Sequence, residues 1–105
     1  MDEKIFEISF SIISVAGDAK SLAFEAINEA KLGNIDKANE IIQKSKDEMV
    51  KAHRFQTELI QKEASGEKTE VGVILIHAQD HLMNAMNFIQ LAQEFIDVYD
   101  RLENK

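Results

Sequence analysis

The chain contains no cysteine and no proline, and only four of its 105 residues are glycine. The lack of cysteine excludes disulfides, a thiolate nucleophile and a thiolate metal site. Because proline and glycine interrupt helices, their scarcity favours long uninterrupted helices over a strand-and-turn architecture. A chain of this length suits one compact domain, which we expect to span residues 1–105.

Basic residues are also few, since 12 lysines and arginines stand against 19 aspartates and glutamates and give a formal charge of −7. Nonspecific binding to nucleic acid or to an anionic membrane needs a net basic surface, so both partners are disfavoured. The sequence lacks a run of about 20 apolar residues that would span a membrane. The apolar segment 5–16 has one lysine and two acidic residues before it, unlike a secretory signal. We therefore expect a cytoplasmic protein without membrane insertion.

Two breaks divide the chain into three predicted helices. Gly33-Asn34 is typical of a helix end, and Asp36 is placed to cap the next helix. The segment 65–68 is the second break. Short connections between long helices predict an antiparallel up-down-up three-helix bundle. The expected helices are Asp2 to Leu32, Asp36 to Ala64, and Thr69 to Glu103.

The first and third predicted helices carry more apolar residues than a lone bundle needs. A heptad row runs along the first helix: Ile5, Ile8, Ile12, Val15, Ala19, Leu22 and Ala26. The third helix has a first row of the same kind: Val71, Leu75, Ala78, Leu82, Ala85, Ile89, Ala92, Ile96 and Tyr99. Two further rows on the third helix are also partly apolar, and one stripe suffices for a bundle. This surplus predicts self-association in a closed ring, and the alternative is a single bundle with a large core.

A polar run, His77 to Met83, interrupts this apolar third helix. His77 and His81 are four residues apart and therefore share one helix face. They are either a hydrogen-bonded pair at the bundle edge or two ligands of a zinc ion, with His53 and Asp80 as further ligands. Zincins need glutamate directly after the first histidine, and alanine stands there, so this motif excludes metalloprotease chemistry.

Asp80 lies on the third row of this helix, between Val73, Ile76 and Met83. A carboxylate on an apolar row is not buried in its ionised form without a partner. If symmetric copies meet along this row, their carboxylates converge and must share a proton or bind a cation. Mg²⁺ is a hard cation that suits such oxygen ligands.

The remaining catalytic possibility is histidine as a nucleophile. The sequence has no phosphate-cradling glycine loop and no Ser-His-Asp arrangement with a nucleophile elbow. A neutral imidazole nitrogen can accept a phosphoryl group, provided that the ring is exposed and donors for the phosphoryl oxygens lie nearby. His77 has candidate donors in His81, Gln79 and Asn84. The nitrogen that reacts stays open, because it depends on the hydrogen bond made by the other one.

The run HAQDHLM resembles the signature of the IIA component of the lactose/cellobiose and N,N′-diacetylchitobiose branch of the bacterial sugar phosphotransferase system. The resemblance extends over nearly the whole chain. It includes the first-helix segment Ala16 to Ser21, the pair Ala52-His53 followed by Gln56-Thr57, and the loop Ala64 to Glu67.

This resemblance implies a homotrimer of three-helix bundles. It implies that His77 accepts a phosphoryl group from phospho-HPr, with the tele nitrogen as candidate, and passes it to a cysteine of the cognate IIB protein. The membrane permease IIC then takes up a β-linked disaccharide such as cellobiose, chitobiose or lactose. The resemblance further implies one Mg²⁺ or similar divalent cation per trimer, bound by Asp80 at the axis. We expect His81 and Gln79 to support the ring or the phosphoryl oxygens of His77.

Two other classes of function stay open on the residues alone. One is a non-catalytic helical oligomerisation module, in which His77 has no chemical role. The other is a structural zinc-binding bundle.

Overall fold

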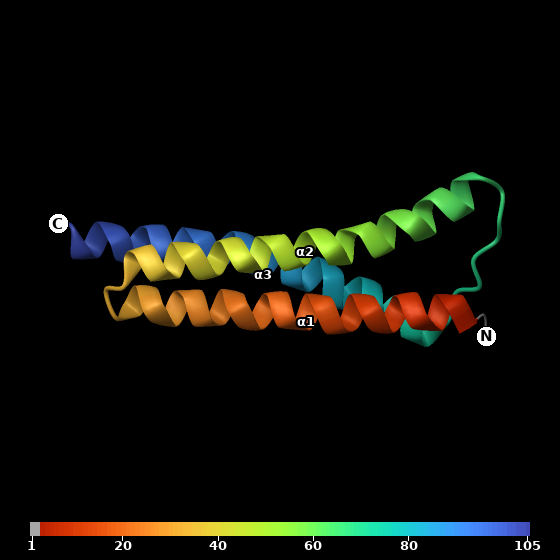
Figure 1. Ribbon diagram of the computed structural model, residues 1–105, viewed down its shortest axis with the longest axis horizontal. Coiled ribbons are helices and arrows are strands. Elements are labelled where there is room, and N and C mark those ends of the chain that lie inside the picture. Colours follow the sequence, from red (N-terminus) through yellow and green to blue (C-terminus); the bar gives the residue numbers. More distant parts are fainter. Residues whose placement is uncertain (1–2) are drawn as a thin grey trace.

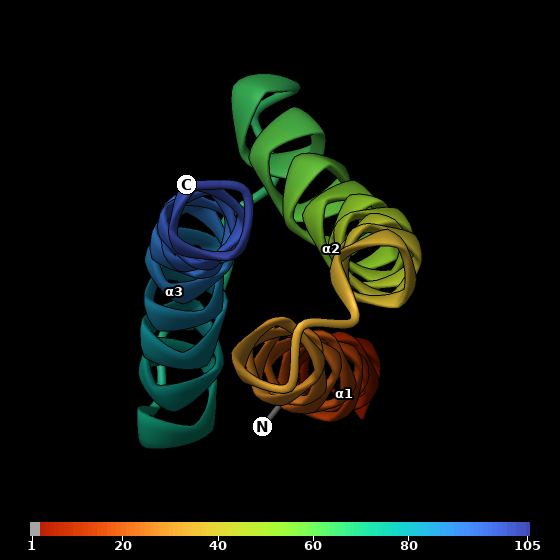
Figure 2. The same ribbon diagram turned by 90° about the vertical axis from the view of Figure 1, so that its left-hand side faces the viewer.

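The computed structural model describes residues 3–105, which form three long helices (Figure 1). These are α1 (Glu3–Lys31), α2 (Ile35–Ala64) and α3 (Val73–Glu103), and the described part of the chain contains no strand. The helices α1 and α3 run in one direction and α2 in the other, over a body of 55 × 20 × 16 Å. Seen end-on, they occupy the corners of a triangle, with α3 inclined to α1 (Figure 2). The predicted all-α up-down-up bundle is confirmed.

The connection between α1 and α2 differs in detail from the prediction. Gly33 adopts φ +85°, a left-handed conformation that glycine tolerates best, and ends α1. The N-cap of α2 is Asn34 rather than Asp36, which lies in the first turn of α2. Asn34 makes no side-chain capping bond, because its amide donates instead to the Glu29 carboxylate in α1 at 2.8 Å.

The third helix begins at Val73, four residues later than expected from the sequence. Residues 67–72 have no regular secondary structure, and Gly66 before them adopts φ +95°. Gly72 is the N-cap of α3 with an extended backbone (φ −123°, ψ 178°). The polar and β-branched residues of this connection have no buried face to pack, so they bridge the ends of α2 and α3 instead of adding a turn to α3.

Alanine on α1 allows both neighbouring helices to approach it closely. All five alanines from Ala16 to Ala30 lie along its buried face, at spacings of three and four residues and with at most 2% exposure: Ala16, Ala19, Ala23, Ala26 and Ala30. Of the rows predicted on α3, the first forms the core and is buried from Leu75 to Ile96. Val71 is wrong as a core residue, since it precedes α3 and is 67% exposed.

The surplus apolar residues of α3 are exposed in the single chain. They form two groups on the side of α3 away from the core: Val73, Ile76 and Met83, and further along Leu91, Phe95, Val98 and Leu102. No residue in the described range 3–105 covers them. Self-association in a closed ring therefore stays a prediction that this exposure favours. No helix in residues 3–105 combines the length and the apolar character needed to cross a membrane.

Two buried serines complete the polar bonding of the core. The Ser45 hydroxyl in α2 donates to the Ala19 carbonyl in α1 at 2.5 Å and so ties the two helices together. The Ser9 hydroxyl donates to the Ile5 carbonyl of its own helix at 2.7 Å. Every buried side-chain nitrogen or oxygen in the described residues has a partner.

We expect Ser45→Ala to lower the free energy of unfolding by about 1 kcal/mol, because it removes a buried hydrogen bond between two helices. Ser9→Ala is the matched control, since it removes a bond within one helix and should cost less. Urea denaturation of both variants measures the difference. Equal losses would contradict the role of Ser45 in joining α1 to α2.

Candidate functional site

The polar run occupies the second and third turns of α3, where the core decides the exposure of each member. Ala78 and Leu82 pack inward and are fully buried. Because the helix turns by about 100° per residue, this places the residues between them on three different sides. His77 and Asp80 are exposed, whereas Gln79 and His81 are partly buried.

His77 and His81 contact each other directly. Their Nε2 atoms are 3.0 Å apart, and their ring centroids are 4.4 Å apart with the planes at 79°. A hydrogen bond at this distance needs one Nε2–H and one Nε2 lone pair. When both rings are neutral, one ring therefore has its proton on Nε2 and the other on Nδ1.

This arrangement can support nucleophilic chemistry at His77. The His77 ring is exposed, so a second protein can reach it. When His81 is the donor, the His77 Nε2 lone pair is held in place by a single N–H group. That N–H lies beside the position that a phosphoryl oxygen would take once phosphorus bonds to His77 Nε2.

Gln79 lies on a different side of α3 from His77. It follows His77 by two residues, which is about 160° around the helix by the shorter way. The Gln79 carbonyl accepts a hydrogen bond of 2.8 Å from the Gln56 amide in α2. Within this chain, Gln79 therefore joins α3 to α2. The support for the His77 ring that we expected from Gln79 is not made within the single chain and stays a prediction.

Asp80 points away from the core, about 60° around α3 from His77. It is exposed, and its Oδ1 accepts a hydrogen bond of 3.2 Å from Asn84. Asn84, a candidate donor for the phosphoryl oxygens, is thus paired with Asp80. The neighbours of Asp80 on this row, Ile76 and Met83, are 60% and 50% exposed.

The structure does not assemble the predicted zinc ligands within one chain. Across residues 3–105, no three His, Asp or Glu side chains are grouped so that they could hold a metal ion. His53 is exposed on α2 and lines a groove with Met49 of its own helix and Met86 of α3. Gln56, one turn further along α2, reaches the polar run through Gln79.

One cluster beside the histidines was missed in the sequence. The Phe24 ring on α1 packs on the Phe88 ring of α3, with centroids 4.2 Å apart. Lys20 places its Nζ 5.8 Å from the Phe88 centroid, within the range of a cation–π contact. The signal was present, since Lys20 and Phe24 are four residues apart on α1, and Phe88 follows His81 by seven residues on α3.

The fold and the site together define a class: small all-α proteins with two contacting histidines on an open helix surface. Residues 7–100 match the model of the family described as the lactose/cellobiose-specific IIA subunit of the phosphotransferase system. The lichenan-specific phosphotransferase enzyme IIA component of Bacillus subtilis (strain 168) is 47% identical to this chain over 102 residues. That match covers 97% of this chain and 93% of the relative.

Solved structures agree with this match. The cellobiose-specific enzyme IIA of Bacillus anthracis is 52% identical with a TM-score of 0.95, covering all of this chain and 96% of the other. The IIA of the N,N′-diacetylchitobiose branch of Escherichia coli, solved in complex with HPr, is 34% identical with a TM-score of 0.83. It covers 94% of this chain and 96% of the other. The chain belongs to the lactose/cellobiose-specific IIA family and is a component of a sugar phosphotransferase system.

Proposed function

We propose that His77 is the phosphoryl acceptor of this IIA component and that its Nε2 atom takes the group. The observation that carries the proposal is the contact between the exposed His77 ring and His81, with the two Nε2 atoms 3.0 Å apart. Of the three histidines in the chain, His53 is on another helix and has no such partner ring. The single catalytic residue is His77, and His81 positions it.

The transfer breaks one phosphorus–nitrogen bond and forms another. The His77 Nε2 lone pair attacks phosphorus, and the electron pair of the donor's P–N bond returns to the donor imidazole. His81 must then release its hydrogen bond to His77 Nε2, because that lone pair is now bonded to phosphorus. The freed His81 N–H donates to a phosphoryl oxygen and stabilises the charge there. Transfer to a cysteine thiolate reverses these steps at His77.

The donor in this proposal is phospho-HPr and the next acceptor is the cysteine of the cognate IIB protein. The complex of the E. coli chitobiose IIA with HPr supports the first partner, since that IIA is 34% identical to this chain. The sugar is a β-linked disaccharide such as cellobiose, chitobiose or lactose, taken up through the permease IIC. The names of the relatives, which specify lichenan, cellobiose and chitobiose, support this substrate class. The proposal places the chain in the cytoplasm.

The functional assembly in this proposal is a homotrimer around the Asp80 row. The exposed apolar neighbours of Asp80 favour contact between copies, and three such carboxylates would converge near the axis. One Asp80 oxygen already accepts from Asn84, and a carboxylate is a suitable ligand for Mg²⁺ or a similar divalent cation. The cation would neutralise the converging charge and takes no part in phosphoryl transfer.

We expect wild-type protein to gain one phosphoryl group per chain when mixed with phosphoenolpyruvate, enzyme I and HPr, and His77→Ala to gain none. His53→Ala is the matched control and should be phosphorylated like wild type, because His53 lies on α2 away from the pair. Intact-mass spectrometry at neutral to alkaline pH measures the added mass, since phosphohistidine is acid-labile. An added phosphoryl group on His77→Ala would contradict the assignment.

We expect Asp80→Leu to preserve the trimer and to raise its Tm, by an amount corresponding to about 1–4 kcal/mol. The replacement turns a converging charge cluster into apolar packing. MgCl₂ should raise the Tm of wild type and not that of the variant. Phosphorylation of His77 should continue, because Asp80 lies on another side of α3.

Asp47→Leu is the control for this change, since Asp47 is an exposed carboxylate on α2 that likewise accepts a hydrogen bond from an amide of its own helix, that of Gln43. Its trimer should keep the Mg²⁺ response of wild type. Sedimentation and thermal melting measure both variants. Dissociation of the trimer on Asp80→Leu would show that the carboxylate is not at the axis.

A further inference from the structure

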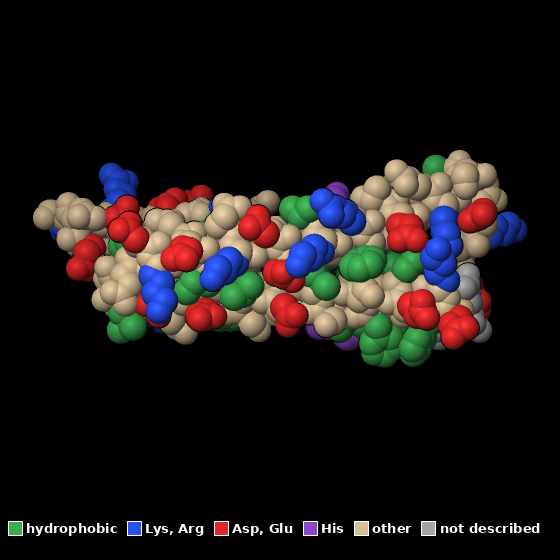
Figure 3. All heavy atoms as spheres, in the orientation of Figure 1, with side chains coloured by type: hydrophobic (Ala, Val, Ile, Leu, Met, Phe, Trp, Pro, Cys, Tyr) green, Lys and Arg blue, Asp and Glu red, His purple; other side chains and the backbone are tan. Residues whose placement is uncertain are grey.

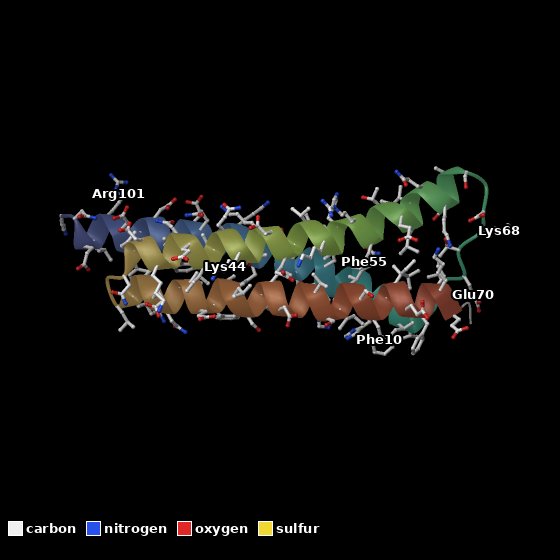
Figure 4. All side chains as sticks on the ribbon, viewed as in Figure 1. Phe10, Lys44, Phe55, Lys68, Glu70 and Arg101 are labelled. Atoms are coloured by element: carbon white, nitrogen blue, oxygen red, sulfur yellow. The ribbon has the colours of Figure 1, made fainter. Side chains whose placement is uncertain are left out.

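A line of exposed aromatic side chains on α1 is interrupted by a glycine. Phe10, Gly17 and Phe24 follow one another at seven-residue spacing, so they lie on nearly the same side of the helix. Phe10 and Phe24 are 48% and 51% exposed, and Phe6 extends the line with its ring 4.6 Å from that of Phe10. Figure 4 shows Phe10 projecting from α1 at the edge of the bundle. Gly17 is thus a notch between two exposed phenylalanines.

The helix register places this notch beside the histidine pair. The contact between the Phe24 and Phe88 rings fixes α1 against α3. Both helices run in the same direction. Gly17 precedes Phe24 on α1 by seven residues, and His81 precedes Phe88 on α3 by seven residues, so both lie about 10.5 Å along their helices from the ring contact. In Figure 3, purple histidine atoms border the green apolar patch on this edge.

Contacts within the chain do not explain glycine at this position. Gly17 is in the middle of a 29-residue helix, where glycine is less favourable than alanine. It does not have a positive φ, and a Cβ built on it meets no atom within 4 Å. The bundle itself would therefore accept a methyl group here and would gain stability from alanine.

We infer that the notch at Gly17 receives the backbone of the protein that delivers the phosphoryl group to His77. This inference rests on the proposed function of His77. A bare helix backbone allows a protruding segment of a partner to lie close to α1, between Phe10 and Phe24, at the level of His81. The two phenylalanines form the apolar part of the docking surface, and Gly17 sets how near the donor comes to the histidines.

The charge around the notch indicates the chemistry of that donor. Three exposed acidic residues border the line on one side of α1, Glu7, Asp18 and Glu25, and the exposed Lys20 lies on its other side, toward Phe88. The docking surface is therefore apolar in the middle and acidic along one side. It fits a partner whose apolar patch is bordered by lysine or arginine, and electrostatic attraction of this kind raises the rate of association.

The test compares Gly17→Leu with Asn39→Leu, which places the same leucine side chain at an exposed position of α2. We expect Gly17→Leu to lower kcat/KM for phosphorylation by phospho-HPr about tenfold, because its side chain fills the notch. Phosphoramidate, which gives up its phosphoryl group with loss of ammonia and needs no docking surface, should phosphorylate His77 in the variant at the wild-type rate. Asn39→Leu should match wild type with both donors.

Gly17→Ala adds only one methyl group, so it keeps the test valid if the leucine variant fails to fold. It should raise the Tm and still lower transfer from phospho-HPr, whereas Asn39→Ala should raise the Tm and leave transfer unchanged. Normal transfer in both Gly17 variants would overturn the inference. A change of oligomeric state would show that a second copy of the chain occupies the notch, and this would also overturn the inference. If only transfer to IIB were slower, the notch would belong to the docking surface for the acceptor, which would overturn the inference as well. Failure of wild type to accept phosphate from either donor would overturn the proposed function itself.

Discussion

The burial of one face of α3 determines what every polar residue of the run can do. Ala78 and Leu82 are fully enclosed by α1 and α2, so the rotation of α3 about its axis is fixed. With this rotation, the periodicity of the helix places the histidines on the side of α3 near α1, Gln79 on the side near α2, and Asp80 on the exposed side. Four positions within five residues therefore face three different sides of α3: the histidines face α1, Gln79 pairs α3 with α2, and Asp80 lies on the exposed surface. The roles proposed for the histidines in phosphoryl transfer and for Asp80 in assembly use this separation.

An open helix surface suits a protein that receives a group from one protein and gives it to another. An enclosed pocket would exclude water but would also exclude the second protein, whereas the exposed His77 ring can be reached by both. The cost is that little of the chain surrounds the phosphoryl group. In this chain the hydrogen-bond donor that lies closest to His77 is His81. The position of the His77 ring therefore depends on this one short contact and on the partner protein.

Much of this architecture could be predicted from the sequence. The helix ends at Gly33 and near Gly66 could be predicted because glycine is common where a helix ends. Both glycines adopt a positive φ that other residues avoid. The His77–His81 contact followed from four-residue spacing. The start of α3 was placed too early, since a helix in residues 69–72 would have had no core to pack against. The hydrogen bond between Gln79 and Gln56 was not predicted, because it depends on how α2 packs against α3; the supporting role of Gln79 toward His77 stays a prediction.

The central claim is that phosphorus bonds to Nε2 of His77. The most direct test is ³¹P–¹⁵N NMR of protein labelled with ¹⁵N-histidine and phosphorylated through HPr. The account predicts one phosphorus–nitrogen coupling, to Nε2 of His77, and none to Nδ1 of that ring. A coupling to Nδ1, or to either nitrogen of His81 or His53, would contradict it.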